Sequence, residues 1–133
     1  MASEDRGLSE ERRAELKAEF ERRRGFWAPV WDHVLDADPE YFKAYLEFSS
    51  VPWENGVLEP KVKELIYIAV DAAVTHMHPI GTRQHIRNAL RHGATKEEIM
   101  EVLELISVLG FHSVGMGLPI LQEELEKAGG EDA

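Results

Sequence analysis

Helix start and stop signals recur along this chain and limit it to one class of fold. The clearest signal is Thr95-Lys96-Glu97-Glu98, a capping box in which the side chains of Thr95 and Glu98 can each bind the other's exposed backbone amide. Further signals are the N-cap residues Ser9 and Asp38 and the helix-ending glycines Gly25 and Gly93. No long stretch alternates apolar and polar residues with a period of two. The sequence therefore predicts an all-α protein.

Apolar spacing gives the expected helices. We expect them over about residues 9–24, 26–35, 39–48, 60–75, 79–92 and 96–109 and from Pro119 onward, with a turn at 51–56, a loosened segment at 110–117 and a frayed tail at 129–133. The aromatic residues of 26–48 are expected in a core or a subunit interface. In the fourth helix, Val62, Leu65, Ala69 and Ala72 predict a buried stripe that ends at His76.

Length and composition exclude several classes of function. The 133 residues fit a single domain, 1–133, with 1–25 as an amino-terminal helical arm. A formal net charge of −10 repels nucleic acids, and the absence of cysteine excludes disulfides and thiol chemistry. The amino terminus lacks the features of a signal peptide, and no apolar run approaches the ~20 residues that span a bilayer. We therefore expect a cytoplasmic protein that binds neither nucleic acid nor membrane.

Chemistry-bearing residues are concentrated in the segment from Thr75 to His85. It holds His76, His78, Arg83 and His85, and a proline at position 79 breaks the chain between the histidines. Glu64 and Asp71 lie on the apolar helix just before it. We expect carboxylates and imidazoles to meet in a pocket here, with Asp71 in a supporting position.

The order of these elements resembles the carboxymuconolactone decarboxylase and alkylhydroperoxidase D-like family. The resemblance rests on Glu64-Leu65-Ile66, the alanine-rich helix after it and the segment from His85 to Ile99, and it covers about residues 53–125. It implies an all-α, oligomeric protein, a homotrimer or homohexamer, with a small pocket between helices near a subunit boundary. We expect the oligomer to form through the amino-terminal helices.

Residues of the family's peroxidase branch match this chain only in part. In that branch a glutamate, a Cys-x-x-Cys pair and a following histidine act together. By position, Glu64 matches the glutamate, His76 and Gly81 match the cysteines, and His85 matches the histidine, with two extra residues between His76 and Gly81. Peroxidase activity is therefore not expected. The resemblance implies decarboxylase-like acid–base chemistry on a small carboxylated or lactone-like metabolite, as a lyase or else an isomerase or hydrolase.

Several interpretations of the site remain open. In the first, Glu64, His76 and His85 are catalytic, Arg83 and His112 bind an anionic substrate, and no cofactor is required. In the second, His76, His78 and His85, with Glu64 or His112, bind a divalent transition metal. In the third, the protein is a non-catalytic oligomeric ligand-binding module. Any single histidine could also have a purely structural role.

Overall fold

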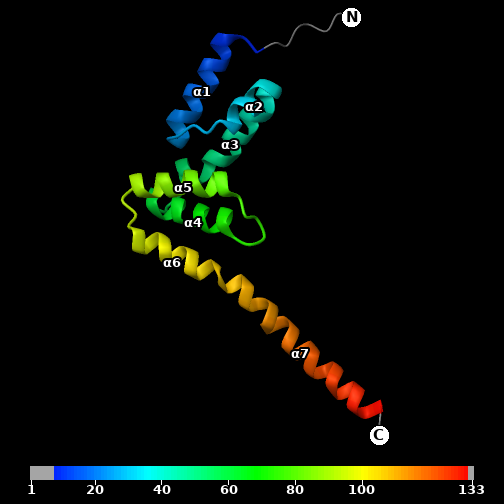
Figure 1. Cartoon of the computed structure of the whole chain (residues 1–133). Coiled ribbons are helices and arrows are strands. Elements are labelled where there is room, and N and C mark those ends of the chain that lie inside the picture. The colour runs from blue at the N-terminus through cyan, green and yellow to red at the C-terminus, as the bar shows by residue number, and fades with distance from the viewer. Residues whose placement is uncertain (1–7, 132–133) are drawn as a thin grey trace, which may run out of the picture. The chain divides into compact units, whose positions relative to one another are not determined.

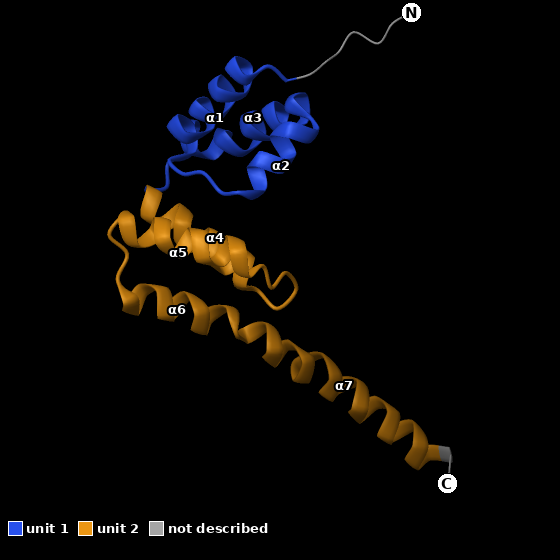
Figure 2. Cartoon of the chain, turned by 45° about the horizontal axis from the view of Figure 1, so that its top comes forward, with its two compact units in different colours: residues 1–59 blue, residues 60–133 orange. Residues whose placement is uncertain are grey.

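The protein is all-helical, as the sequence predicts (Figure 1). The computed structural model describes residues 8–131, which form seven α-helices and no strand. The helices are α1 (Glu10–Arg24), α2 (Val30–Ala37), α3 (Pro39–Asn55), α4 (Pro60–Ala72), α5 (Pro79–Arg91), α6 (Lys96–Ile106) and α7 (Val108–Glu131). The chain divides into two compact units, Met1–Glu59 and Pro60–Ala133 (Figure 2). Each unit has its own core.

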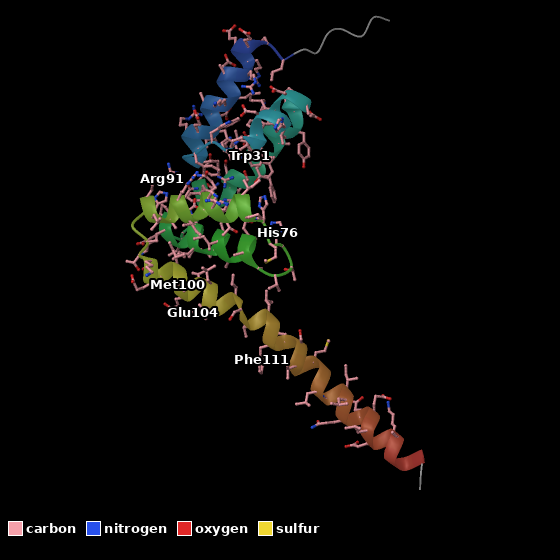
Figure 3. All side chains as sticks on the ribbon, in the orientation of Figure 1. Trp31, His76, Arg91, Met100, Glu104 and Phe111 are labelled. Atoms are coloured by element: carbon pink, nitrogen blue, oxygen red, sulfur yellow. The ribbon has the colours of Figure 1, made fainter. Side chains whose placement is uncertain are left out.

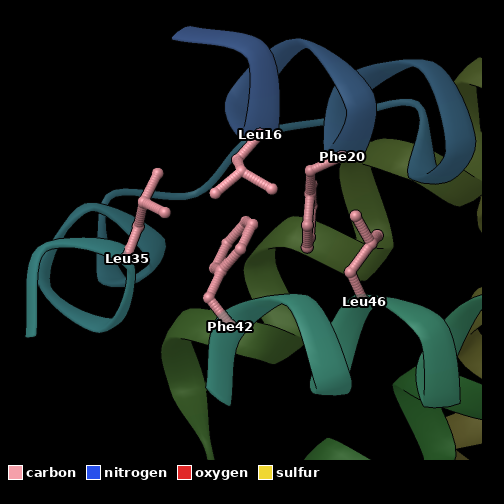
Figure 4. Close-up of a cluster of buried hydrophobic side chains, with 5 residues drawn as sticks. All are labelled: Leu16, Phe20, Leu35, Phe42 and Leu46. Carbon is pink, nitrogen blue, oxygen red and sulfur yellow. The ribbon is translucent and has the colours of Figure 1, made fainter. Parts of the chain in front are cut away.

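Helices α1 to α3 of the first unit enclose an aromatic core (Figure 4). Its fully buried side chains are Leu16, Phe20, Leu35, Phe42 and Leu46. The ring of Phe20 lies 5.3–5.7 Å from the rings of four other aromatic residues, Phe26, Trp27, Trp31 and Phe42. These contacts confirm that most of the aromatic segment forms a core, because rings at this spacing combine apolar burial with favourable edge contacts. Tyr41 and Phe48 point outward instead.

The predicted caps of the first unit are present. The Ser9 hydroxyl accepts a hydrogen bond from the backbone N–H of Arg12, and Asp38 accepts one from the N–H of Tyr41. Gly25 adopts φ 77°, the left-handed conformation that ends α1. The start of α2 differs from the prediction: the helix begins at Val30, and residues 26–29 form a short connection before it.

The predicted turn at 51–56 is wrong, because α3 continues through Pro52 to Asn55. Arg23 contacts this helix on both sides of the proline. Its guanidinium pairs with Glu47 at 2.8 Å and with Glu54 at 2.5 Å. These glutamates are two helical turns apart on one face of α3, so α1 braces the helix on both sides of Pro52.

In the second unit, α4 and α5 form a hairpin and α6 packs against α4. The buried apolar residues are Ile68, Ala89, Ala94 and Ile99. The capping box at the start of α6 is confirmed, since Glu98 accepts a hydrogen bond from the N–H of Thr95 at 2.8 Å and Thr95 accepts one from the N–H of Glu98 at 3.1 Å. An ion pair of 2.9 Å between Lys61 and Glu98 also joins α4 to α6.

The buried stripe of α4 differs from the predicted one. The helix ends at Ala72, and its most buried positions are Glu64, Ile68 and Asp71. The predicted stripe is only partly buried, and His76 is exposed, with a side chain 52% accessible. The carboxylate of Glu64 lies in the interior beside His85 and Asn88 of α5. The carboxylate of Asp71 lies beside His76 and His78 of the turn. This placement of Glu64 and Asp71 creates the candidate site.

The predicted break at 110–117 is also wrong, because α7 is one helix from Val108 to Glu131 that continues through the three glycines of this segment and through Pro119. The predicted frayed tail is helical as far as Glu131, and the rest of it lies outside the described residues. Nearly all side chains of α7 are exposed, including the labelled Phe111 (Figure 3). Pro119 has no N–H to donate to the carbonyl of residue 115, and water can bind that carbonyl on an exposed helix.

The stretch Lys96–Gly130 is long and apolar enough, by length and composition alone, to cross a membrane. The expectation that no stretch of the chain reaches this length therefore needs correction. Core helices of soluble proteins meet the same criterion of length and composition, but those helices are mostly buried, whereas 6% of the apolar window of this stretch is buried.

Candidate acid–base site

A carboxylate and an imidazole form a buried pair at the centre of the α4–α5 hairpin. Nδ1 of His85 lies 2.6 Å from Oε2 of Glu64. The Glu64 side chain is 1% exposed and that of His85 is 13% exposed. A short contact between such groups away from water is a charge-assisted hydrogen bond. A carboxylate accepts hydrogen bonds, so the neutral His85 that pairs with it carries its proton on Nδ1 and has its lone pair on Nε2.

Asn88 holds the other oxygen of Glu64. Its amide nitrogen donates to Oε1 of Glu64 at 3.3 Å, and its amide oxygen accepts from Gln84 at 2.9 Å and from Arg91. This arrangement fixes the amide orientation of Asn88, because its oxygen faces two donors and its nitrogen faces the carboxylate. Asn88 therefore holds one oxygen of the Glu64 carboxylate, and Gln84 and Arg91 of the same helix hold Asn88 in place.

The second nitrogen of His85 faces Asp71. Nε2 lies 3.7 Å from Oδ2 of Asp71, whose side chain is 12% exposed. The ring of Tyr67 stacks on the imidazole with centroids 4.6 Å apart and an angle of 22°. His85 is thus fixed on one edge by Glu64 and on one face by Tyr67, while its other edge points to a second carboxylate.

Two further histidines gather around Asp71 from the turn between α4 and α5. Nε2 of His76 lies 3.4 Å from Oδ1 of Asp71, and Nδ1 of His78 lies 3.7 Å from Oδ2. The two imidazole centroids are 5.3 Å apart. Figure 3 labels His76 on this turn. Asp71 therefore stands between the buried pair and the exposed histidines.

A cavity of about 640 Å³ opens beside this turn. Its lining includes Asp71, His78, Arg83 and Arg87. The two arginines are one helical turn apart on α5 and are exposed. Within residues 8–131 no carboxylate forms an ion pair with either of them. The cavity therefore combines a carboxylate beside His85 with two guanidinium groups that can bind an anion.

Most of the predicted site residues lie close together. Glu64 and His85 form a direct pair, whereas His76 and His78 contact Asp71 instead. Arg83 lines the cavity with His78. His112 is exposed on α7 and is not among the residues that line this cavity in the described part of the chain, so the hairpin does not bring it to the other histidines.

The sequence prediction gave Asp71 too small a role. The structure places it in contact with His76, His78 and His85. The signal was present, because Glu64 and Asp71 are seven residues apart and so share one face of α4. The prediction extended the helix to residue 75 and did not foresee the tight turn that brings His78 back to Asp71. Arg87, Asn88 and Tyr67 were also not predicted.

Fold and site together define a class of protein: an all-helical chain with a buried glutamate–histidine pair beside a cavity. The sequence matches the model of the carboxymuconolactone decarboxylase family over residues 39–113. That match covers more than half of the chain, and the chain belongs to this family. The recognition of the family from sequence is confirmed.

Two known proteins are similar to this chain, and the description of one of them names the activity of this family. A solved structure from Burkholderia xenovorans LB400, described as a "putative gamma-carboxymuconolactone decarboxylase subunit", is 54% identical and superposes with a TM-score of 0.86 over 90% of this chain and 48% of its own. "Uncharacterized protein 4 in cox locus" from Paracoccus denitrificans is 42% identical over 60 residues, which are 45% of this chain and 52% of that protein. The chain thus spans about half the length of either relative.

Proposed function

We propose that this protein is an acid–base enzyme that acts on a small carboxylated or lactone-like metabolite. The observation that carries the proposal is the buried contact of 2.6 Å between Glu64 and His85, with Nε2 of the same imidazole 3.7 Å from the carboxylate of Asp71 that lines the cavity. A histidine oriented by a buried carboxylate is suited to accept and return a proton near neutral pH.

His85 is the proton-transferring group in this proposal, and Glu64 positions it. When Nε2 takes up a proton, the imidazolium is stabilised by Glu64 on one side and by Asp71 on the other. Decarboxylation breaks a carbon–carbon bond, releases carbon dioxide and leaves the electron pair on the remaining lactone as an enolate. Protonation of a carbon of this enolate by His85 completes the reaction, and solvent returns a proton to the enzyme.

Substrate binding is assigned to Arg83 and Arg87. A chain with a net charge of −10 needs local positive charge to admit an anion, and these two guanidinium groups supply it at the cavity. The lactone carboxylate named by the family is an anion of suitable size for a cavity of about 640 Å³. His76, predicted as a catalytic residue, lies on Asp71 and not on the buried pair, so we assign it a different role below.

The test measures carbon dioxide release from γ-carboxymuconolactone. We expect His85→Ala to lower kcat by about 10²–10⁴-fold, the usual contribution of a general acid or base. Arg83→Ala is expected to raise KM more than it lowers kcat. His33→Ala, which removes an exposed histidine of the first unit, is the matched control and should have no effect. Binding of the lactone without turnover by the wild-type protein would instead identify a ligand-binding module.

Assembly into a homotrimer or homohexamer in the cytoplasm is part of the same proposal. The exposed apolar side chains of α7 make this helix a better candidate interface than the amino-terminal helices, and they include Phe111, Val114, Met116, Leu118, Ile120, Leu121 and Leu125. The acidic chain disfavours an anionic membrane surface. Light scattering of the detergent-free protein tests this: a Leu121→Glu variant should dissociate, whereas protein that stays soluble only in detergent would indicate a membrane partner.

A further inference from the structure

We propose that Asp71, His76 and His78 form a binding site for a divalent first-row transition metal ion. This site does not include Glu64 or His85 as ligands, although Asp71 also faces Nε2 of His85, and its existence does not depend on the function proposed above. The three side chains each offer one ligand atom, and these atoms all lie within 4.8 Å of one another. Two imidazoles and one carboxylate are the ligands that Zn²⁺ and Fe²⁺ prefer in open sites.

The distances fit a metal site better than a hydrogen-bonded cluster. Asp71 lies 3.4 Å from His76 and 3.7 Å from His78, which is beyond the usual hydrogen-bond range. Ligands at about 2.1 Å from one tetrahedral ion are separated by roughly 3.4 Å. Since the two imidazoles are 52% and 48% exposed, they can rotate by the small amount that closes the set around an ion.

The backbone of the turn holds the ligands on one side. The N–H of His78 donates to the carbonyl of Asp71 at 2.8 Å, so the chain folds back on the carboxylate. Met77, between the two histidines, has φ 47° and is the one non-glycine residue with positive φ in the described chain. Such a conformation is unfavourable for methionine and persists where the surroundings require it. Here it turns both imidazoles toward Asp71.

The absence of a side chain at Gly81, in the first turn of α5, leaves room for the side chains of Asp71 and His78. A Cβ atom at position 81 would collide with the carboxylate of Asp71 and would lie 2.5 Å from Nδ1 of His78. A side chain at this position would force the carboxylate of Asp71 and the imidazole of His78 to move away from α5.

The site is open on the side of the cavity. Asp71 and His78 both line it, together with Arg83 and Arg87. Three protein ligands leave at least one coordination position for water or for an oxygen of an anion held by the arginines. The carboxylate of Asp71 also lies 3.7 Å from Nε2 of His85, so an ion bound here would compete for the carboxylate that faces the proposed acid–base residue.

The experiment is titration of the tag-free, metal-stripped full chain with Zn²⁺ by calorimetry, with elemental analysis after dialysis and Co²⁺ absorption as a report on geometry. We expect one ion per chain. His76→Ala and His78→Ala should each weaken binding by at least about 100-fold, more than the loss of an outer-shell partner. Asp71→Asn keeps the shape of the buried side chain and should have the same effect. His33→Ala should leave binding unchanged.

Variants of the acid–base pair separate this proposal from the previous one. Glu64→Gln and His85→Ala should retain Zn²⁺ with wild-type stoichiometry, whatever they do to turnover. Loss of Zn²⁺ in His85→Ala would assign the ion to His76, His78 and His85 and overturn the role of Asp71. Absence of binding to the wild-type protein, or equal weakening in His33→Ala and His76→Ala, would overturn the site altogether. Circular dichroism checks that each variant is folded.

Discussion

Replacement of Glu64 by glutamine tests the buried pair at the level of single atoms. The change keeps the shape of the side chain but gives it one acceptor and one donor. If its oxygen faces Nδ1–H of His85, its new amide group faces the amide nitrogen of Asn88, where Glu64 now accepts a bond of 3.3 Å. Asn88 cannot rotate its amide without cost, because its oxygen accepts from Gln84 and Arg91. Two donors therefore face each other inside the protein.

The size of the effect follows from these contacts. One unsatisfied buried donor costs about 1–3 kcal/mol, and exchange of a charge-assisted hydrogen bond for a neutral one costs about 1 kcal/mol more. We therefore expect Glu64→Gln to lower the free energy of unfolding by about 2–4 kcal/mol. Because the side chain is 1% exposed, water does not reduce this cost. Chemical denaturation followed by far-ultraviolet circular dichroism measures it.

A second substitution separates stability from catalysis. In the double variant Glu64→Gln/Asn88→Asp, the new carboxylate can accept from the new amide and still accept from Gln84 and Arg91. We expect most of the lost stability to return. Activity should stay about 10²–10⁴-fold below that of the wild type, because the negative charge no longer touches His85. Full activity in Glu64→Gln, or recovery of activity together with stability, would refute the reasoning.

Three further substitutions test the packing, the capping and an ion pair within the two units. Phe20→Ala empties the centre of the first core and should cost about 3–5 kcal/mol; tryptophan fluorescence measures it, since all three tryptophans lie in residues 1–59, and a cost below 1 kcal/mol would contradict the described packing. Thr95→Ala removes half of the capping box and should cost about 1 kcal/mol, with faster amide exchange at the start of α6; unchanged exchange would speak against the cap. Lys61 and the backbone N–H of Thr95 hold the pKa of Glu98 below its ordinary value of 4.5. The stability from this lowered pKa is complete above pH 4.5 and is lost as the pH falls through the lower value in the folded protein. Lys61→Met should therefore weaken the dependence of the free energy of unfolding on acid pH. An unchanged dependence would mean that the ion pair between Lys61 and Glu98 does not contribute to stability.

Local signals in the sequence predicted the helical fold well wherever side chains act on nearby backbone. Ser9, Asp38 and the pair Thr95 and Glu98 all cap the helices that they were expected to cap. Gly25 and Gly93 both have positive φ. These interactions span three or four residues, so they depend little on the rest of the molecule.

Helix length was predicted less well, because distant contacts decide it. Proline and glycine at 51–56 and 110–119 suggested breaks, yet α3 and α7 continue through them. In α3 the ion pairs of Arg23 with Glu47 and Glu54 span the proline. These partners are 24 and 31 residues apart in the chain, so no local pattern could show that they meet.

The turn after α4 determines which of the predicted residues contact one another in the site. The sequence identified Glu64 and His85 through a family resemblance, and their direct contact agrees with that expectation. The alignment of His76 with the family's cysteine placed it beside them, but the chain folds back at Ala73 and the imidazole contacts Asp71 instead. A positive φ at Met77 is required for this turn, and methionine gives no sign of it in a sequence.

Asp71 determines how the two proposals relate to each other. Its oxygens face His76 on one side and both His78 and His85 on the other. A carboxylate bound to a metal ion has less negative charge to offer a neighbouring group, so an ion at His76 and His78 would weaken the interaction of Asp71 with Nε2 of His85. If both proposals hold, Zn²⁺ should lower the rate of protonation by His85, and His76→Ala should remove that inhibition while leaving the Glu64–His85 contact intact. A rate that does not respond to Zn²⁺ in a protein shown to bind it would mean that Asp71 is not shared between the two sites.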